Sequence, residues 1–172
     1  MSFISRILGL GPDPREELRP LWHRIIEIAR EEDWYAKHGA SDTLEGRFDM
    51  ITAVHSLMLL RMEKSPELVT PSVMLTELFV EDMDGQMREA GVGDVVVGKH
   101  IGKQMAVLGG RLGALRDALP NADNAKLTAA VERNLTLVEG ADPANMASVL
   151  RALWDQLGDL TDEAIKVGDV PR

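Results

Sequence analysis

The stretch Asp82–Lys99, DMDGQMREAGVGDVVVGK, is the feature around which the chain is organised. It begins as the end of one helix, passes through a turn broken by Gly91 and Gly93, and restarts as another helix. Glycines at this spacing permit positive φ and a close approach of the backbone. The stretch therefore predicts two helices joined by a tight turn.

Charged residues of both signs crowd around this turn and predict a fixed polar network. Its expected members are Arg47, Asp82, Asp84, Arg88, Glu89, Asp94 and Lys99. Arg47 is included because an arginine in the first turn of a helix faces the positive end of the helix dipole. It needs an acidic partner, for which Asp82 and Asp84 are the candidates. The pattern leaves open whether the network binds a partner or only holds the turn.

The composition favours an α-helical domain. The chain has 172 residues, enough for a real core, and 45% of them are apolar although only 4% are aromatic. Unbranched side chains such as Leu and Met keep their rotamer freedom in a helix. The chain contains no cysteine, which excludes disulfides, zinc–thiolate sites and cysteine nucleophiles and fits a reducing compartment.

A formal net charge of −9 argues against a nucleic-acid partner, because a negative field repels phosphate backbones. No apolar run approaches the roughly 18 to 20 residues of a transmembrane helix. The start of the chain also lacks the apolar core and cleavage site of a signal peptide. We therefore expect a cytoplasmic protein, with a peripheral position at the inner membrane left open.

Helical periodicity recurs between breaks along the chain and predicts an all-α, single-domain bundle of about six helices. The expected helices cover about residues 13–32, 42–64, 70–90, 97–119, 124–138 and 143–165. Asp13 and Asp142 are the expected N-caps of two of them, and the helix that ends near residue 64 is expected to open at Ser41 or Asp42. The chain divides into an arm (1–12), a principal helical domain (13–120) and C-terminal helices that pack on it (121–172).

The N-terminal arm is short and amphipathic. Its apolar residues stand at helical spacing: Phe3, Ile4, Ile7 and Leu8. Glycines and prolines then break the pattern. The arm either packs on its own bundle or touches a membrane surface or partner, and so few apolar residues bind lipid only weakly.

Glycines recur along the expected helix 97–119, at Gly102, Gly109, Gly110 and Gly113. Each costs roughly 1 kcal/mol relative to alanine in a helix interior. Their recurrence favours close packing of this helix against another helix over a ligand site.

No catalytic, metal or cofactor motif is complete. Residues 93–99 match GxxxxGK of a phosphate-binding loop, but His100 follows where Ser or Thr belongs, and a helix precedes the loop. The pattern Asp82-x-Asp84-Gly85 has the wrong spacing for a calcium loop, and the histidines lack metal-site spacing. An enzyme would need a strongly perturbed pair of groups in a deep cleft. We therefore expect no enzyme and no cofactor.

A binding protein remains, with methionines along its central helices. Thioether side chains adapt to varied apolar partners, although methionine is also an ordinary core filler. The candidates for the core or an apolar groove beside the turn are His55, Met58, Met62, Phe79 and Met83. A lone histidine on an apolar face is more often a hydrogen-bonded core residue than a ligand.

Two segments taken together resemble the ubiquinol–cytochrome c chaperone family, over about residues 15–120. The first holds Trp34-Tyr35, the run Ser41–Phe48 and His55. The second comprises Asp82-Met83-Asp84, Met87-Arg88-Glu89, Gly91–Asp94, Val97-Gly98-Lys99 and Gly110-Arg111. The resemblance implies a helical assembly factor that binds a membrane-protein client, cytochrome b, while ubiquinol–cytochrome c reductase is built. The chain is similar to a compact bacterial relative, since it lacks a transit peptide.

The leading hypothesis is therefore a non-catalytic chaperone for an apolar membrane-protein segment. The alternative is a small-molecule or lipid-binding helical module with an anion site. Its cations would be Arg47, Arg88, Lys99 and Arg111. If these side chains pair with carboxylates instead, no anion site remains.

Overall fold

The computed structural model describes residues 13–89 and 97–171, without the side chains of residues 87–89, 97–101, 103 and 104. Over these residues the fold is all-α, as the periodicity predicts, with one isolated bridge between Ala40 and Leu137. The elements are η1 (Pro14–Leu18), α2 (Arg19–Ala29), α3 (Glu32–Ala36), α4 (Leu44–Met62), η2 (Pro66–Leu68), α5 (Val69–Glu89), α6 (Val97–Ala118), α7 (Ala125–Asn134), α8 (Pro143–Gly158) and α9 (Asp162–Val167).

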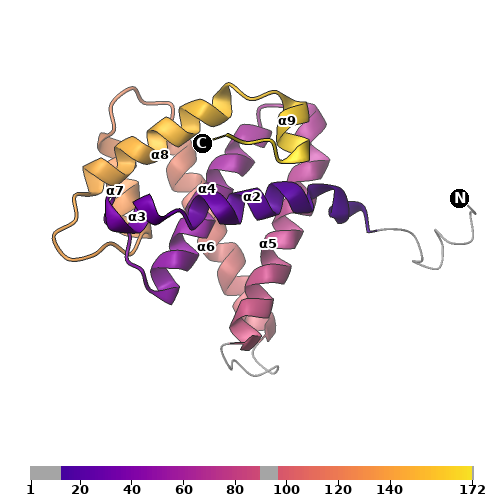
Figure 1. Ribbon diagram of the computed structural model, residues 1–172, viewed down its shortest axis with the longest axis horizontal. Helices are drawn as coiled ribbons and strands as arrows, with labels where there is room; N and C mark the ends of the chain where they lie inside the picture. Colours follow the sequence, from indigo (N-terminus) through magenta and orange to yellow (C-terminus); the bar gives the residue numbers. More distant parts are fainter. Residues whose placement is uncertain (1–12, 90–96, 172) are drawn as a thin grey trace, which may run out of the picture.

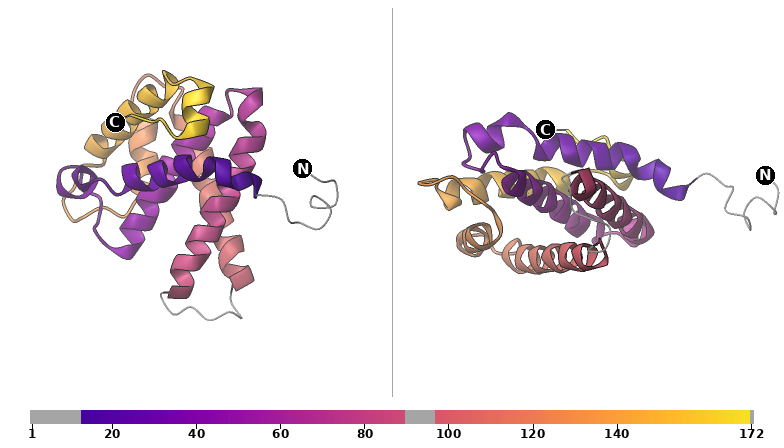
Figure 2. Two further views of the ribbon diagram at one scale, coloured as in Figure 1. Left: turned by 45° about the vertical axis from the view of Figure 1, so that its right-hand side comes forward. Right: turned by 90° about the horizontal axis from the view of Figure 1, so that it is seen from below.

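The central helix is α4, whose residues are buried without a break from Asp49 to Met62. It contacts α2, α5, α6 and α8. Figure 2 shows α2 on one side of α4 and α5, and α6 on the opposite side. A helix that is covered all round in this way belongs to the interior of the bundle.

The predicted first helix, 13–32, is divided in the structure. Residues Pro14–Leu18 form the 3₁₀ turn η1, and α2 then ends at Ala29. Pro20 has no N–H to donate to the carbonyl four residues earlier, so the chain cannot continue one regular ladder through this point. Asp13 caps η1 as predicted, with its carboxylate 2.9 Å from the Arg15 amide.

The last two predicted helices are shorter than expected. The helix expected over 124–138 ends at Asn134, because Leu135 is extended and Leu137 bridges to Ala40. The helix expected over 143–165 stops at Gly158, and Thr161 caps the separate helix α9. Asp142 caps α8 as predicted, accepting a hydrogen bond from the Ala144 amide at 2.9 Å.

The start of α4 corrects the predicted cap. Thr43, and not Asp42, is the N-cap, and its hydroxyl accepts from the Gly46 amide at 3.1 Å. The chain passes so close here that a Cβ on residue 46 would lie 2.0 Å from the Ser41 carbonyl oxygen. Only glycine fits at this position, which explains its place in the Glu45-Gly46-Arg47 run.

Buried Arg61 joins the C-terminal helices to the centre of the bundle. Its guanidinium donates to the carbonyls of Leu157 at 3.0 Å and Leu160 at 2.5 Å and lies 3.1 Å from Asp162. Hydrogen bonds from Ser65 and then Arg61 hold the pKa of Asp162 below its usual value. The Leu157 carbonyl is in the last turn of α8, where it also accepts from the Leu160 amide at 3.4 Å, and the Leu160 carbonyl is in the link to α9, so Arg61 fixes both the end of α8 and this link.

Candidate functional site

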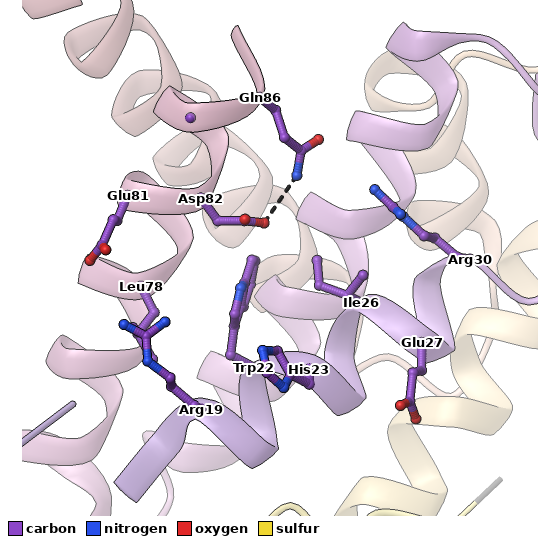
Figure 3. Close-up of a pocket in the computed structure, with 11 residues that line it drawn as sticks. Arg19, Trp22, His23, Ile26, Glu27, Arg30, Leu78, Glu81, Asp82 and Gln86 are labelled. Atoms are coloured by element: carbon purple, nitrogen blue, oxygen red, sulfur yellow. Dashed lines mark hydrogen bonds between the residues drawn. The ribbon is translucent and has the colours of Figure 1, made fainter. Parts of the chain in front are cut away.

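A groove of about 580 Å³ runs between α2 and α5, and we call it the α2–α5 groove. Figure 3 shows Trp22 and Ile26 reaching toward it from α2, and Asp82 and Gln86 from α5. Its lining consists of Arg19, Trp22, His23, Ile26, Glu27, Arg30, Leu78, Glu81, Asp82, Gly85 and Gln86. The volume is within the range of roughly 300–1,000 Å³ typical of ligand pockets.

The apolar side of the groove rests on the core. Trp22 and Leu78 are almost completely buried, whereas Ile26 is half-buried. The Trp22 ring meets the Phe79 ring edge-on, with centroids 6.0 Å apart. Ile26 lies beside the apolar stripe of α2, which already contains Ile25, so the stripe is wider than the core alone requires. That extra apolar residue was the sequence signal for this groove.

The charged rim of the groove is only partly neutralised. Arg19 pairs with Glu16 at 2.7 Å, and Glu81 pairs with Arg15 at 2.9 Å. The Asp82 carboxylate accepts from the Gln86 amide at 3.0 Å. Among the described residues, Arg30 is exposed and makes no ion pair. The rim therefore places the guanidinium of Arg30, which has no ion-pair partner among the described residues, next to an apolar surface.

The predicted polar network is only partly visible in the structure. Asp82 lines the α2–α5 groove, and Asp84 is half-buried on α5. Arg88 and Glu89 belong to α5 and Lys99 belongs to α6, but their side chains lie outside the described part, as does Asp94 entirely. The network as a whole stays a prediction.

The partner of Arg47 differs from the predicted one. Its guanidinium donates to Asp42 at 2.6 Å, whereas Asp82 and Asp84 were the expected partners. This hydrogen bond holds the pKa of Asp42 below its usual value. Asp42 lies directly before Thr43, the N-cap of α4, so a carboxylate close in sequence meets an arginine in the first turn, where the helix dipole favours negative charge.

The five apolar candidates all lie in the core. Met58, Met62, Phe79 and Met83 are at most 2% exposed, and His55 is 0% exposed. Burial lowers the pKa of His55 to about 3, which keeps the ring neutral. Neither ring nitrogen has a hydrogen-bond partner among the described residues, so the expected hydrogen-bonded histidine is not found. A direct role in binding would require this core to open.

A buried ion pair that the sequence analysis missed joins α4 to α6. Arg111 donates to a carboxylate oxygen of Asp49, and both side chains are under 10% exposed. The other carboxylate oxygen of Asp49 accepts from the Thr136 amide at 2.8 Å and hydroxyl at 2.6 Å. An aspartate inside the apolar run of residues 48–62 was the available signal.

These pairings bear on the alternative anion site. Arg47 is occupied by Asp42 on the surface, and Arg111 is occupied by Asp49 in the interior. Two of the four cations on which that hypothesis depends therefore have carboxylate partners, and these lie in different places, one just before α4 and one inside it. No observation on the described residues favours the anion site.

The expected close packing of the glycines on α6 is wrong. A Cβ added at Gly102, Gly109, Gly110 or Gly113 would meet none of the described atoms outside its own stretch of helix within 4 Å. The buried side of α6 is formed by larger residues instead, such as Leu108, Arg111 and Leu115. The glycines fall on the other side of the helix, where Met105 is 41% exposed.

The part of the chain that is described offers neither a metal cluster nor a membrane-spanning helix. Its His, Asp and Glu side chains form no group of three or more that could hold a metal ion. Within the same residues, each helix is too short or too polar to cross a bilayer.

Comparisons with known proteins agree with the resemblance seen in the sequence. A family model described as ubiquinol-cytochrome C chaperone matches residues 36–170 and so includes α7, α8 and α9. The crystal structure of the Cbp3 homolog from Brucella abortus superposes with a TM-score of 0.80 at 27% sequence identity, covering 98% of this chain and 95% of that chain. A search of curated proteins finds no significant match.

Proposed function

The chain belongs to the ubiquinol–cytochrome c chaperone family, and on that premise we propose that it is a non-catalytic assembly factor for ubiquinol–cytochrome c reductase. Its client is an apolar segment of a membrane-protein subunit, with cytochrome b as the first candidate. It works on the cytoplasmic side of the inner membrane, where it holds that segment until assembly.

The α2–α5 groove is the observation that supports this proposal. Helical segments commonly bind in grooves that take apolar anchors and exclude water from them. Here Ile26 offers accessible apolar surface, and Trp22 and Leu78 support it from the core. Arg30 and exposed His23 stand at the edge, where they can hold the polar end of the same segment. The groove thus combines an apolar floor with donors at one side.

Photo-crosslinking from single positions tests whether the client occupies the groove. A photoreactive amino acid is placed at His23 or Arg30, and at exposed Lys126 and Glu132 of α7 as controls. Membranes containing newly made cytochrome b are then added. We expect crosslinks to cytochrome b from the two groove positions and none from α7. Crosslinks from α7 alone would move the client site away from the groove.

Two substitutions of an aliphatic residue by aspartate test whether the apolar lining of the α2–α5 groove binds the client. Ile26→Asp places a charge in the groove, whereas Val138→Asp changes an exposed side chain in the segment between α7 and α8. Burying an apolar side chain such as Ile26 against the client contributes about 1.5–3 kcal/mol, so its loss should lower the affinity for the client about tenfold or more. We expect this loss for Ile26→Asp only, with thermal unfolding showing that both variants remain folded. Equal client recovery from the two would contradict a role for the floor.

Arg88→Ala tests the polar network as a separate part of the proposal. A folded variant that no longer recovers cytochrome b would support a client surface at the end of α5 where Arg88 lies. A variant that unfolds would indicate that the network is architectural. If even the wild-type chain recovers no membrane protein, the chaperone proposal fails as a whole.

A further inference from the structure

A second groove lies between η1 and the first turns of α5, and we call it the η1–α5 groove. Its volume is about 390 Å³, and Pro14, Val69, Val73 and Met74 contribute its apolar lining. Val69 is 55% exposed and Val73 is 56% exposed. Since the two valines are four residues apart, they stand on one face of α5 and form a continuous apolar surface.

The chain enters the described structure at the edge of this groove. Asp13 and Pro14, the first two described residues, both line it. The indigo start of the described ribbon lies beside α5 in both Figure 1 and Figure 2. The stretch of α5 from residue 69 to 77 is about 12 Å long at 1.5 Å per residue. Twelve preceding residues reach along it easily, even without being extended.

The composition of residues 1–12 matches the groove. Their large apolar residues are Met1, Phe3, Ile4, Ile7, Leu8 and Leu10, and they contain Arg6 but no Asp or Glu. On the groove side, Arg15 is held by Asp13 at 2.6 Å and by Glu81 at 2.9 Å. Glu77, also in the lining, is exposed and forms no ion pair with a described residue. Arg6 and Glu77 are therefore complementary in charge.

We propose that residues 1–12 dock on the chain's own body, with Phe3, Ile4, Ile7 and Leu8 covering Val69 and Val73 in the η1–α5 groove. A tethered segment meets its own groove at an effective concentration that a free partner seldom reaches. The other use of the arm, anchoring on a lipid surface, is opposed by its few apolar residues and by the net charge of −9, which anionic lipids repel.

Paramagnetic relaxation in the full chain tests the docking. Because the chain contains no cysteine, Ser5→Cys carries a nitroxide label at a single site. We expect loss of most amide signal intensity over residues 69–77 and none over α8. Val73→Asp should abolish the loss, and since that side chain is more than half exposed, the fold is retained. Val138→Asp, a matched change at an exposed valine, should leave the loss intact.

Three outcomes would overturn the proposal. The first is a relaxation effect that is absent from residues 69–77 or unchanged by Val73→Asp. The second is an effect on an isotope-labelled chain from a nitroxide on another chain, which would show that the arm docks on a second copy. The third is an arm whose resonances change only when anionic vesicles are added, which would make it a membrane anchor.

Discussion

The ring of His55 on α4 stacks on the ring of Phe79 on α5, with centroids 4.9 Å apart and planes 8° from parallel. Trp22 from α2 meets the same imidazole edge-on, with centroids 5.6 Å apart. Three helices thus meet at a histidine that has no hydrogen-bond partner among the described residues. Burial lowers the pKa of His55 to about 3, so the folded protein accommodates only the neutral ring.

This contact predicts a loss of stability in mild acid. The unfolded chain binds a proton at His55 below pH about 6.5, whereas the folded chain does not until pH about 3. The free energy of unfolding therefore decreases as the pH is lowered from about 6.5 to about 3. At pH 5 the loss attributable to His55 is about 2 kcal/mol. Urea unfolding at pH 7.5 and pH 5 should therefore show a smaller loss for His55→Phe than for wild type. His23→Phe, a surface change on α2, is the control, and identical pH dependence of all three chains would refute the prediction.

The buried pair of Arg111 and Asp49 predicts a large difference between two arginines of α6. Arg111→Met leaves the Asp49 carboxylate buried without its cation and should cost about 3–5 kcal/mol of unfolding free energy. Arg116→Met removes an exposed pair with Glu63 and should cost less than about 1 kcal/mol. Denaturant unfolding of both variants makes the comparison. Similar costs would mean that Arg111 is not the interior cation that the structure shows.

Two glycines should respond to alanine with opposite signs. Gly46→Ala brings a Cβ to 2.0 Å from the Ser41 carbonyl oxygen, so the start of α4 must shift, at a cost of about 1–3 kcal/mol. Gly109→Ala adds a methyl group that contacts no other part of the described structure within 4 Å, and it should stabilise α6 by up to about 1 kcal/mol. Thermal unfolding measures both effects. A destabilised Gly109→Ala would indicate that this side of α6 is covered.

The hydrogen bonds of Arg61 predict that this residue stabilises α8 and α9 against local unfolding. Arg61→Met removes the donors to the Leu157 and Leu160 carbonyls. The Leu157 carbonyl keeps the hydrogen bond from the Leu160 amide, whereas the Leu160 carbonyl loses its donor among the described residues, at a cost of about 1–3 kcal/mol. Lys64 lies just after the end of α4. Lys64→Met removes only a cation–π contact with Trp154 at 4.2 Å and should cost about 1 kcal/mol or less. Hydrogen exchange should show faster opening of α8 and α9 in Arg61→Met. Unchanged exchange there would show that other contacts hold these helices.

The features that the sequence predicted well are those that depend on residues close together in the chain. Asp13 before Pro14 and Asp142 before Pro143 cap helices in the structure as they do in the pattern. The family resemblance is confirmed as well, because the family model spans residues 36–170, which contain all of the quoted motifs except Trp34-Tyr35. Even the error at Asp42 was local, since Thr43 next to it supplies the cap.

Which side chains meet across the bundle was decided only by the tertiary structure. Arg111 finds Asp49 at a separation of 62 residues, and Arg61 finds Leu157 at a separation of 96. The glycines of α6 face away from the bundle, and Ile26 faces a groove. Periodicity determines which residues share a helix face, because that depends on 3.6 residues per turn. It does not determine what that face meets, because that depends on how whole helices pack.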